Sequence, residues 1–153
     1  MENLKYFNLS MISFLLAVVI VAAPIKPDPK LTPGVADPTA TVKKICTSGY
    51  TATVRNVPAS VKKQVFAEYH IDPTSDKFEV DHLISLELGG SNDIKNLWPQ
   101  SYTTQPLNAH RKDVLENKLH SLICSKQITI KNAQKAISVD WVNAYNKYVN
   151  KSI

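Results

Sequence analysis

Apolar and polar residues alternate in two stretches near the middle of the chain, and this period of two is typical of β-strands. The first stretch, Phe78–Ile84, continues with alternating leucines up to a Gly-Gly-Ser-Asn turn at residues 89–92. Residues Ile94–Trp98 predict a returning strand, which Pro99 ends, and residues 100–105 have the composition of a polar loop. We therefore expect two strands, joined by a loop, at the centre of the domain.

Other segments repeat apolar residues every three or four positions and predict helices. One helix opens near Ala59 or Ser60, and a second begins at Pro106, which suits the first helical position, and runs to Cys124. Thr129 is a suitable cap for a last helix over Ile130–Val149. Ahead of these helices, the alternating run Tyr50–Arg55 predicts one more strand.

The first 23 residues have the pattern of a targeting segment. A polar start with one lysine leads into the apolar run Met11–Ala23, which is shorter than the ~20 residues that a membrane span needs. The pattern predicts export, to the periplasm or the extracellular space. Pro24 is awkward for a signal peptidase, so retention as a membrane anchor stays open, as does a buried core helix.

Residues 24–41 hold five of the nine prolines and few large apolar groups. A segment of this composition is not expected to pack, and it predicts a semi-extended linker. The globular domain is then expected to span residues 42–153, which suffices for one domain with a modest core.

Charge and cysteine content narrow the function classes. The formal charge of +5 favours an acidic partner such as nucleic acid or an anionic membrane, although a basic surface alone is weak evidence. Cys46 and Cys124 are the only cysteines, which excludes a four-cysteine zinc knuckle within the chain. In an oxidising compartment they would form a disulfide; two separate buried thiols are the alternative.

Asp81, His82 and Asn96 supply the side chains that metal-assisted phosphodiester hydrolysis needs. A carboxylate is a hard oxygen ligand for a divalent ion, and a neutral imidazole can take a proton from the attacking water. An amide or a backbone carbonyl can fix the tautomer and direction of that imidazole. On an extended backbone the neighbours Asp81 and His82 would point to opposite faces.

In these residues the chain resembles the HNH, or ββα-metal, endonucleases, and most of all the small exported bacterial members. The resemblance covers Val80-Asp-His-Leu-Ile84, the turn Gly89-Gly-Ser-Asn-Asp93, the segment Asn96-Leu-Trp-Pro99 and the helix that follows. It implies an α+β fold in which a core hairpin plus helix is braced by an N-terminal strand and helix and by a C-terminal helix.

The resemblance also assigns roles to individual positions. It makes Asp81 a metal ligand and His82 the general base, and it makes Asn96 the residue that orients the histidine by bracing the two strands. The helix of this family carries a further ligand, for which Asn108, His110 and Asp113 are the alternatives. The Cys-x-x-Cys pairs that often flank this helix in the family are absent here.

The function implied is hydrolysis of DNA, and of RNA as an option, with low sequence specificity and one divalent ion, Mg²⁺ above others. Arg55, Arg111 and Lys112 are the candidates for contact with the phosphate backbone. We expect a monomer, with membrane contact only if the N-terminal segment is retained. The alternatives are a non-catalytic nucleic-acid-binding or DNA-uptake accessory protein on the same scaffold, and an envelope protein tethered by its proline-rich segment.

Overall fold

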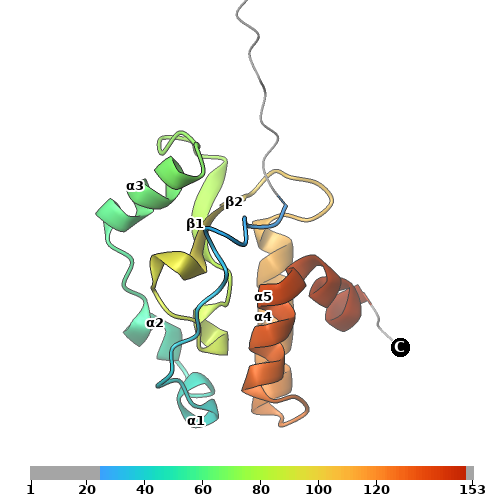
Figure 1. Ribbon diagram of the computed structural model, residues 1–153. Coiled ribbons are helices and arrows are strands. Elements are labelled where there is room, and N and C mark those ends of the chain that lie inside the picture. Colours follow the sequence, from blue (N-terminus) through green and yellow to red (C-terminus); the bar gives the residue numbers. More distant parts are fainter. Residues whose placement is uncertain (1–24, 151–153) are drawn as a thin grey trace, which may run out of the picture.

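The computed structural model describes residues 25–150, which form an α+β fold around a two-stranded antiparallel sheet. Helix α3 packs against the sheet, while α4 and α5 pack against each other on the opposite side of the molecule (Figure 1). The elements are α1 (Val42–Ile45), α2 (Tyr50–Val54), α3 (Ala59–Glu68), β1 (Phe78–His82), the 3₁₀ turns η1 (Leu86–Leu88) and η2 (Ile94–Asn96), β2 (Leu97–Ser101), α4 (Ala109–Cys124), α5 (Ile130–Tyr145) and the π-helical turn η3 (Asn146–Asn150).

The central hairpin is present, but its second strand lies further along the chain than predicted. Strand β2 pairs with β1 from Leu97 opposite His82 to Ser101 opposite Phe78, so the prediction that Pro99 ends the strand is wrong. Proline cannot donate to a sheet, but both strands of this two-stranded sheet are edges, where its missing N–H is tolerated. Residues 94–96 form η2 instead, because the Asp93 side chain accepts from the backbone of Lys95 and caps the turn.

The prediction of a strand over Tyr50–Arg55 is wrong, because residues Tyr50–Val54 form a short helix, α2. Gly49 precedes it with φ of 79°, a left-handed conformation that glycine adopts without strain and that turns the chain into the helix. Within the helix the Thr53 hydroxyl donates to the carbonyl of Tyr50. The structure around this segment overrides its local β preference.

The two long helices begin at capping residues. Thr129 caps α5 by accepting from the backbone of Asn132, as predicted. Helix α5 is kinked at Asp140, whose backbone is not helical, and it ends at Tyr145 before η3. Helix α4 starts at Ala109 rather than at Pro106, because Asn108 is its N-cap and accepts from the backbone of Arg111.

The proline-rich segment packs against the domain, so the expectation that it cannot pack is wrong. The Trp141 indole donates to the carbonyl of Ile25 at 2.8 Å, and the buried hydroxyl of Thr32 donates to the carbonyl of Leu97. Ala36 forms an isolated β-bridge with Gly90. Groups of this segment therefore form hydrogen bonds with the rest of the domain. The predicted targeting segment lies outside the described residues.

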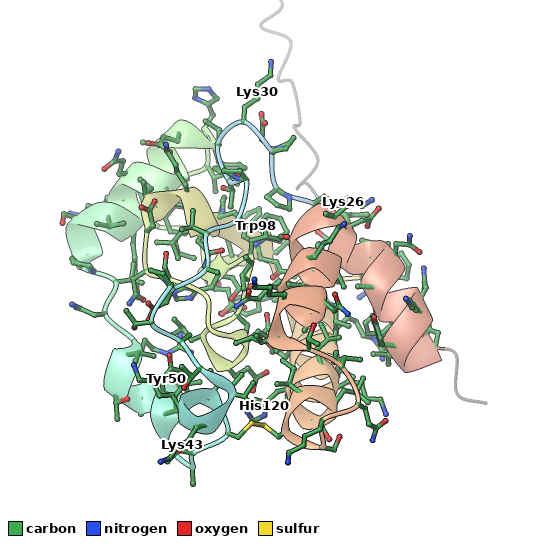
Figure 2. All side chains as sticks on the ribbon, turned by 60° about the horizontal axis from the view of Figure 1, so that its bottom comes forward. Lys26, Lys30, Lys43, Tyr50, Trp98 and His120 are labelled. Carbon is green, nitrogen blue, oxygen red and sulfur yellow. A yellow bond between two sulfur atoms is a disulfide. The ribbon has the colours of Figure 1, made fainter. Side chains whose placement is uncertain are left out.

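The interior holds one apolar cluster between α4, α5 and η1, and Trp98 of β2 is fully buried (Figure 2). The members of the cluster are Ile45, Ile84, Leu88, Leu115, Leu119, Ile123, Ala133, Ile137, Trp141, Ala144 and Tyr145. In the described part of the chain, no helix combines the length and apolar character that crossing a membrane requires.

Candidate active site

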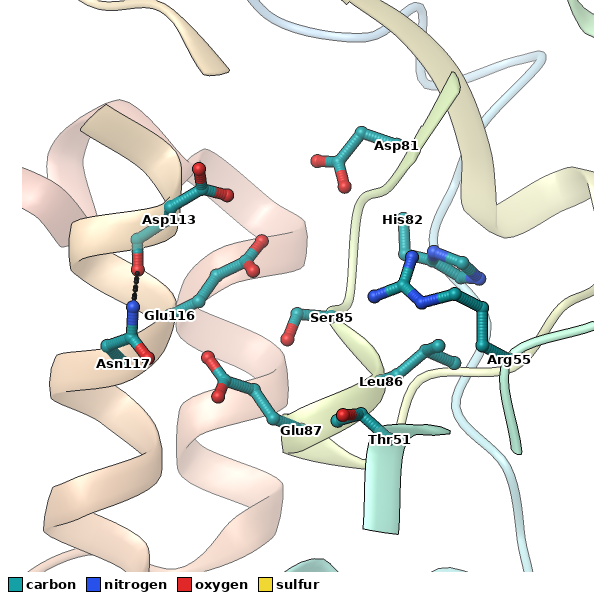
Figure 3. A pocket seen from close by; sticks show the side chains of 10 residues that line it. All are labelled: Thr51, Arg55, Asp81, His82, Ser85, Leu86, Glu87, Asp113, Glu116 and Asn117. Atoms are coloured by element: carbon teal, nitrogen blue, oxygen red, sulfur yellow. Dashed lines mark hydrogen bonds between the residues drawn. The ribbon is translucent and has the colours of Figure 1, made fainter. Parts of the chain in front are cut away.

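A pocket of about 310 Å³ opens where the end of β1 faces α4, with η1 and α2 along its edges (Figure 3). Asp81 and His82 both line it, although neighbours on a strand were expected to face opposite ways. His82 is the last residue of β1, so the strand's alternation ends at this position. The full lining is Thr51, Arg55, Asp81, His82, Ser85, Leu86, Glu87, Asp113, Glu116 and Asn117.

Asn96 is fully buried and holds the chain immediately after His82. Its side-chain oxygen accepts from the backbone N–H groups of Ile84 and Val35, and its NH₂ group donates to the carbonyls of Ile84 and Ser91. The backbone carbonyl of Asn96 accepts from the N–H of Leu83 at 2.7 Å. Asn96 thus braces the loop that leaves β1, and among the described residues it makes no hydrogen bond to the His82 ring.

The Gly89-Gly90 turn completes this bracing. Gly89 ends η1 with a φ of 76°, a left-handed conformation that favours glycine. A Cβ on Gly90 would lie 1.7 Å from the carbonyl oxygen of Ile84 and 3.0 Å from the Asn96 side chain. The close packing of backbone around Asn96 therefore requires glycine at position 90.

The His82 ring is buried, with 3% of the residue exposed, and its Nε2 lies 3.0 Å from Oδ1 of Asn92. Burial lowers the pKa of His82 below its ordinary 6.5, because a charged imidazolium would lose its hydration. The positive charges of Arg55 and Lys112 lower the pKa further, while Asn92 and Asp81 oppose the shift. His82 is therefore neutral at neutral pH, the state that a general base requires.

Lys112 is fully buried between two carboxylates, which corrects its predicted role in phosphate contact. Its ammonium donates to Asp81 Oδ2 at 2.6 Å, to the carbonyl of His82 at 2.7 Å and to Oε1 of Glu116. These three bonds use all three donors of the ammonium group. Burial alone would lower the pKa of Lys112, but Asp81 and Glu116 outweigh it and raise the pKa, so the lysine is charged.

The helix side of the pocket is acidic. Asp113 and Glu116 are three positions apart on α4 and therefore share a face. Burial and nearby negative charges raise the pKa of Asp113, and they raise that of Glu116 to about 8 although Lys112 acts in the opposite direction. Burial also raises the pKa of Glu87, which lines the pocket rather than pointing to solvent.

Of the three alternatives for a ligand on the helix, the structure brings only Asp113 to the pocket. The Asn108 side chain caps α4 and donates to the carbonyl of Tyr102, while the exposed His110 stacks on the Tyr102 ring. Sequence reasoning missed Glu116. The available signal was its spacing of three from Asp113, but which helix face meets β1 was not evident from the pattern.

The three predicted phosphate contacts are in different surroundings. Arg55 is exposed at the end of α2, and Figure 3 shows its guanidinium group beside His82 at the edge of the pocket. Arg111 is exposed on α4, does not line the pocket, and lies 3.4 Å from the hydroxyl of Tyr145. Of the three, only Arg55 is both accessible and at the pocket.

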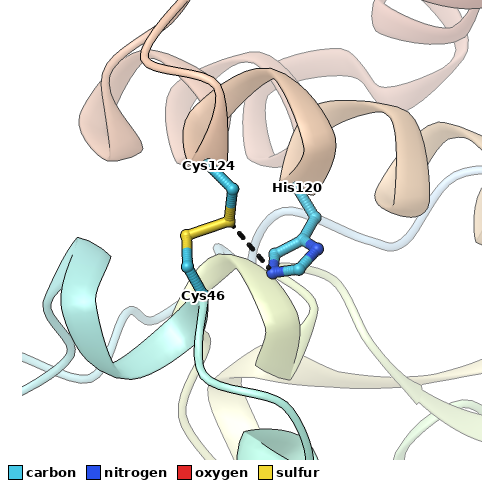
Figure 4. A group of neighbouring side chains, drawn as sticks. All are labelled: Cys46, His120 and Cys124. Carbon is cyan, nitrogen blue, oxygen red and sulfur yellow. Dashed lines mark hydrogen bonds between the residues drawn. A yellow bond between two sulfur atoms is a disulfide. The ribbon is translucent and has the colours of Figure 1, made fainter.

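The disulfide between Cys46 and Cys124 is confirmed and joins the end of α1 to the end of α4 (Figure 4). With His120, the two cysteines form a group whose ligand atoms lie within 4.8 Å of one another and could hold a metal ion. Both sulfur atoms are bonded to each other, however, and Nε2 of His120 lies 2.9 Å from the carbonyl oxygen of Ile45. In this oxidised state the group offers no thiolate ligand.

Comparison of the chain with protein-family models, with curated proteins and with solved structures gives no match.

Proposed function

We propose that the protein is a metal-dependent endonuclease of the HNH, or ββα-metal, type that hydrolyses phosphodiester bonds of DNA with low sequence specificity. The observation that supports this proposal is the shared pocket of Asp81 and His82, at the end of the hairpin, with Asp113 and Glu116 of the following helix. A neutral base and hard oxygen donors meet there in one accessible space. RNA is a second substrate class of the same chemistry.

The donor set fits a divalent cation of the Mg²⁺ class. Asp81, Asp113 and Glu116 offer carboxylate oxygens, the ligands that hard cations prefer. Burial raises the pKa values of Asp113 and Glu116, and neighbouring carboxylates raise them further, although Lys112 acts in the opposite direction. A bound cation would favour the ionised forms of both groups. When bound, such an ion neutralises charge on the scissile phosphate and the leaving oxygen. We assign the helix donors to Asp113 and Glu116 in place of Asn108 and His110.

The remaining steps use side chains of this chain. Neutral His82 accepts a proton from the attacking water, and Asn96 keeps the backbone after His82 in position. Arg55 binds the phosphate with its planar guanidinium group. Most affinity would then come from phosphate contacts and would fall steeply with salt. We further propose export to an oxidising compartment, where a disulfide such as Cys46–Cys124 persists.

A plasmid-nicking assay with Mg²⁺, Mn²⁺, Ni²⁺ or Zn²⁺, and with a chelator, tests the proposal. We expect metal-dependent cleavage that His82→Ala lowers by roughly 100-fold or more, since general-base catalysis contributes this much. The matched control is His70→Ala, which changes an exposed histidine that does not line the pocket and should leave the rate unchanged. Full cleavage by His82→Ala would refute the mechanism.

A second function, nucleic-acid binding without cleavage, is favoured by one observation. The Lys112 ammonium already neutralises part of the acidic cluster, so the pocket can be stable without a metal ion. Binding of labelled DNA at low salt, combined with intact plasmid across all four metals, would support this alternative over hydrolysis.

A further inference from the structure

The carbonyl of Val54, the last residue of α2, fixes the direction of the Asn92 side-chain amide. A carbonyl oxygen can only accept hydrogen bonds, so the Asn92 group 2.8 Å from it is the NH₂. The Asn92 oxygen consequently points the other way, toward His82. The backbone N–H of Asn56 lies 3.4 Å from the same oxygen and agrees with this orientation, because an N–H donates to oxygen.

The Asn92 oxygen in turn determines which nitrogen of His82 carries the proton. It lies 3.0 Å from Nε2 and can only accept, so Nε2 is the protonated nitrogen and Nδ1 keeps its lone pair. Within residues 25–150 no hydrogen bond engages Nδ1 of His82. The ring is therefore held through one nitrogen and free at the other.

We propose that Asn92 is the positioning residue that keeps the proton of His82 on Nε2 and thereby presents Nδ1 as the proton acceptor, with the backbone of α2 fixing the direction of the amide. The resemblance gave the orienting role to Asn96, which contacts the backbone after His82 and not the ring. Two asparagines therefore share the positioning of His82, since Asn96 fixes the loop and Asn92 fixes the tautomer.

We build this inference on the proposed function, since the choice of nitrogen matters for catalysis only if His82 accepts a proton there. The contact itself joins three separate parts of the chain, namely the end of β1, the turn after Gly90 and the C-terminus of α2. Helix α2 acts through a carbonyl group, so the side chain at position 54 carries no part of this role. A pattern of side-chain types along the sequence does not reveal such a contact.

The test is a measurement of the His82 tautomer by ¹⁵N NMR on the full-length protein with a metal chelator present. The pH is set well above the ordinary histidine pKa of about 6.5, so that the ring is neutral. We expect wild-type His82 to carry its proton on Nε2, with an observable Nε2–H signal. In Asn92→Ala the acceptor is lost, so the signal should vanish and the ring nitrogens should show a mixture of tautomers. Asn92→Asp keeps an acceptor oxygen and should retain the Nε2–H pattern.

Cleavage assays on the same variants provide a second readout. We expect kcat of Asn92→Ala to fall roughly 10- to 100-fold, the usual effect of removing such a partner, with little change in KM. Asn92→Asp should recover most of kcat. The matched control Asn132→Ala changes an exposed asparagine of α5 and should alter neither readout. Circular dichroism verifies that each variant is folded.

The outcomes separate this inference from the proposed function. An unchanged Nε2–H pattern in folded Asn92→Ala, or a wild-type ring protonated on Nδ1, would overturn the positioning role even if the protein is an active nuclease. A wild-type protein with the Asn92-dependent pattern that cleaves no substrate would support the positioning role and overturn only the proposed function.

Discussion

The loop side of the pocket, built around Asn92 and Asn96, is neutral and hydrogen-bonded to backbone, whereas the side that faces α4 is built from charges. Each asparagine joins segments that are distant in sequence through its amide group. On the opposite side, the buried Lys112 ammonium holds Asp81 and Glu116 together. The neutral side is independent of pH and salt, while the charged side responds to protons and cations. The first suits the positioning of a base, and the second suits the binding of a metal ion.

The largest effect on stability is expected from Lys112→Met, which breaks the charged side. The substitution leaves the Asp81 carboxylate and the buried acidic group of Glu116 without their cation, so the free energy of unfolding should fall by about 3–5 kcal/mol. Urea denaturation measures this loss. Adding Glu116→Gln to Lys112→Met removes a buried acid that has lost its cation and should restore part of the stability, most of all at alkaline pH. A loss below about 1 kcal/mol, as for a surface ion pair, would show that the cluster is solvated.

A smaller loss is expected from breaking the neutral side with Asn96→Ala. Buried backbone groups at Ile84, Val35 and Ser91 lose their partners, and each unsatisfied group costs about 1–3 kcal/mol, partly relieved by rearrangement. We expect a net loss of about 3 kcal/mol by urea denaturation that is the same at acid and alkaline pH. Asn108→Ala is the matched control, because this asparagine only caps α4 and should cost about 1 kcal/mol. Equal losses at both positions would contradict the bracing role.

The titrating groups of the pocket should also make the stability of the protein depend on pH. The pKa of Glu116 is raised from 4.5 to about 8, so the folded state binds its proton more tightly than the unfolded state does. The resulting stability is complete below pH 4.5 and is lost as the pH rises through about 8. His82 has the opposite effect: because its pKa is lowered, the protein loses stability as the pH falls below 6.5. A plot of stability against pH should therefore show an alkaline limb from Glu116 and an acid limb from His82. Thermal unfolding across pH measures both limbs.

Two variants assign these limbs to their residues. Glu116→Gln should flatten the alkaline limb and leave the acid limb in place, and Mg²⁺ should stabilise the wild type more at alkaline than at acid pH. His82→Ala should remove the acid limb and leave the alkaline limb in place. A wild-type alkaline limb that survives Glu116→Gln would place its origin in a group other than Glu116.

The smallest structural effect is expected from Arg55→Gln at the rim between the two sides. The side chain is exposed, so stability should change by less than about 0.5 kcal/mol. If Arg55 binds phosphate as proposed, its loss should weaken DNA binding and reduce the slope of log affinity against log salt by about 1. Fluorescence anisotropy at several salt concentrations measures both quantities. Arg111→Gln, away from the pocket, is the control, and an equal effect there would remove Arg55 from the site.

Local sequence patterns predicted the features that depend on residues close to one another in the chain. Alternation indicated the hairpin, and Thr129 indicated the start of α5. Asp81 and His82 were singled out together with the turn and Asn96, and the structure places both of them at one pocket. The two cysteines, with an apolar N-terminus, indicated the disulfide.

The remaining features depend on contacts that no local pattern contains. Helix α2 forms against its strand-like alternation because neighbouring segments determine it. Lys112 was predicted to contact phosphate, since nothing in its own helix reveals that its face meets Asp81. Asn92 was counted only as a turn residue, because its partner is a main-chain carbonyl of another element.

The disulfide has a topological consequence for the site. Every residue that lines the pocket, from Thr51 to Asn117, lies between Cys46 and Cys124 in the sequence. The working part of the chain is therefore a covalently closed ring, with the proline-rich segment and α5 attached outside it. A single cut by a protease in the loop between α3 and β1 would open the ring without separating the two halves of the site. A ring of this kind keeps a nicked molecule in one piece, which would suit the export proposed above.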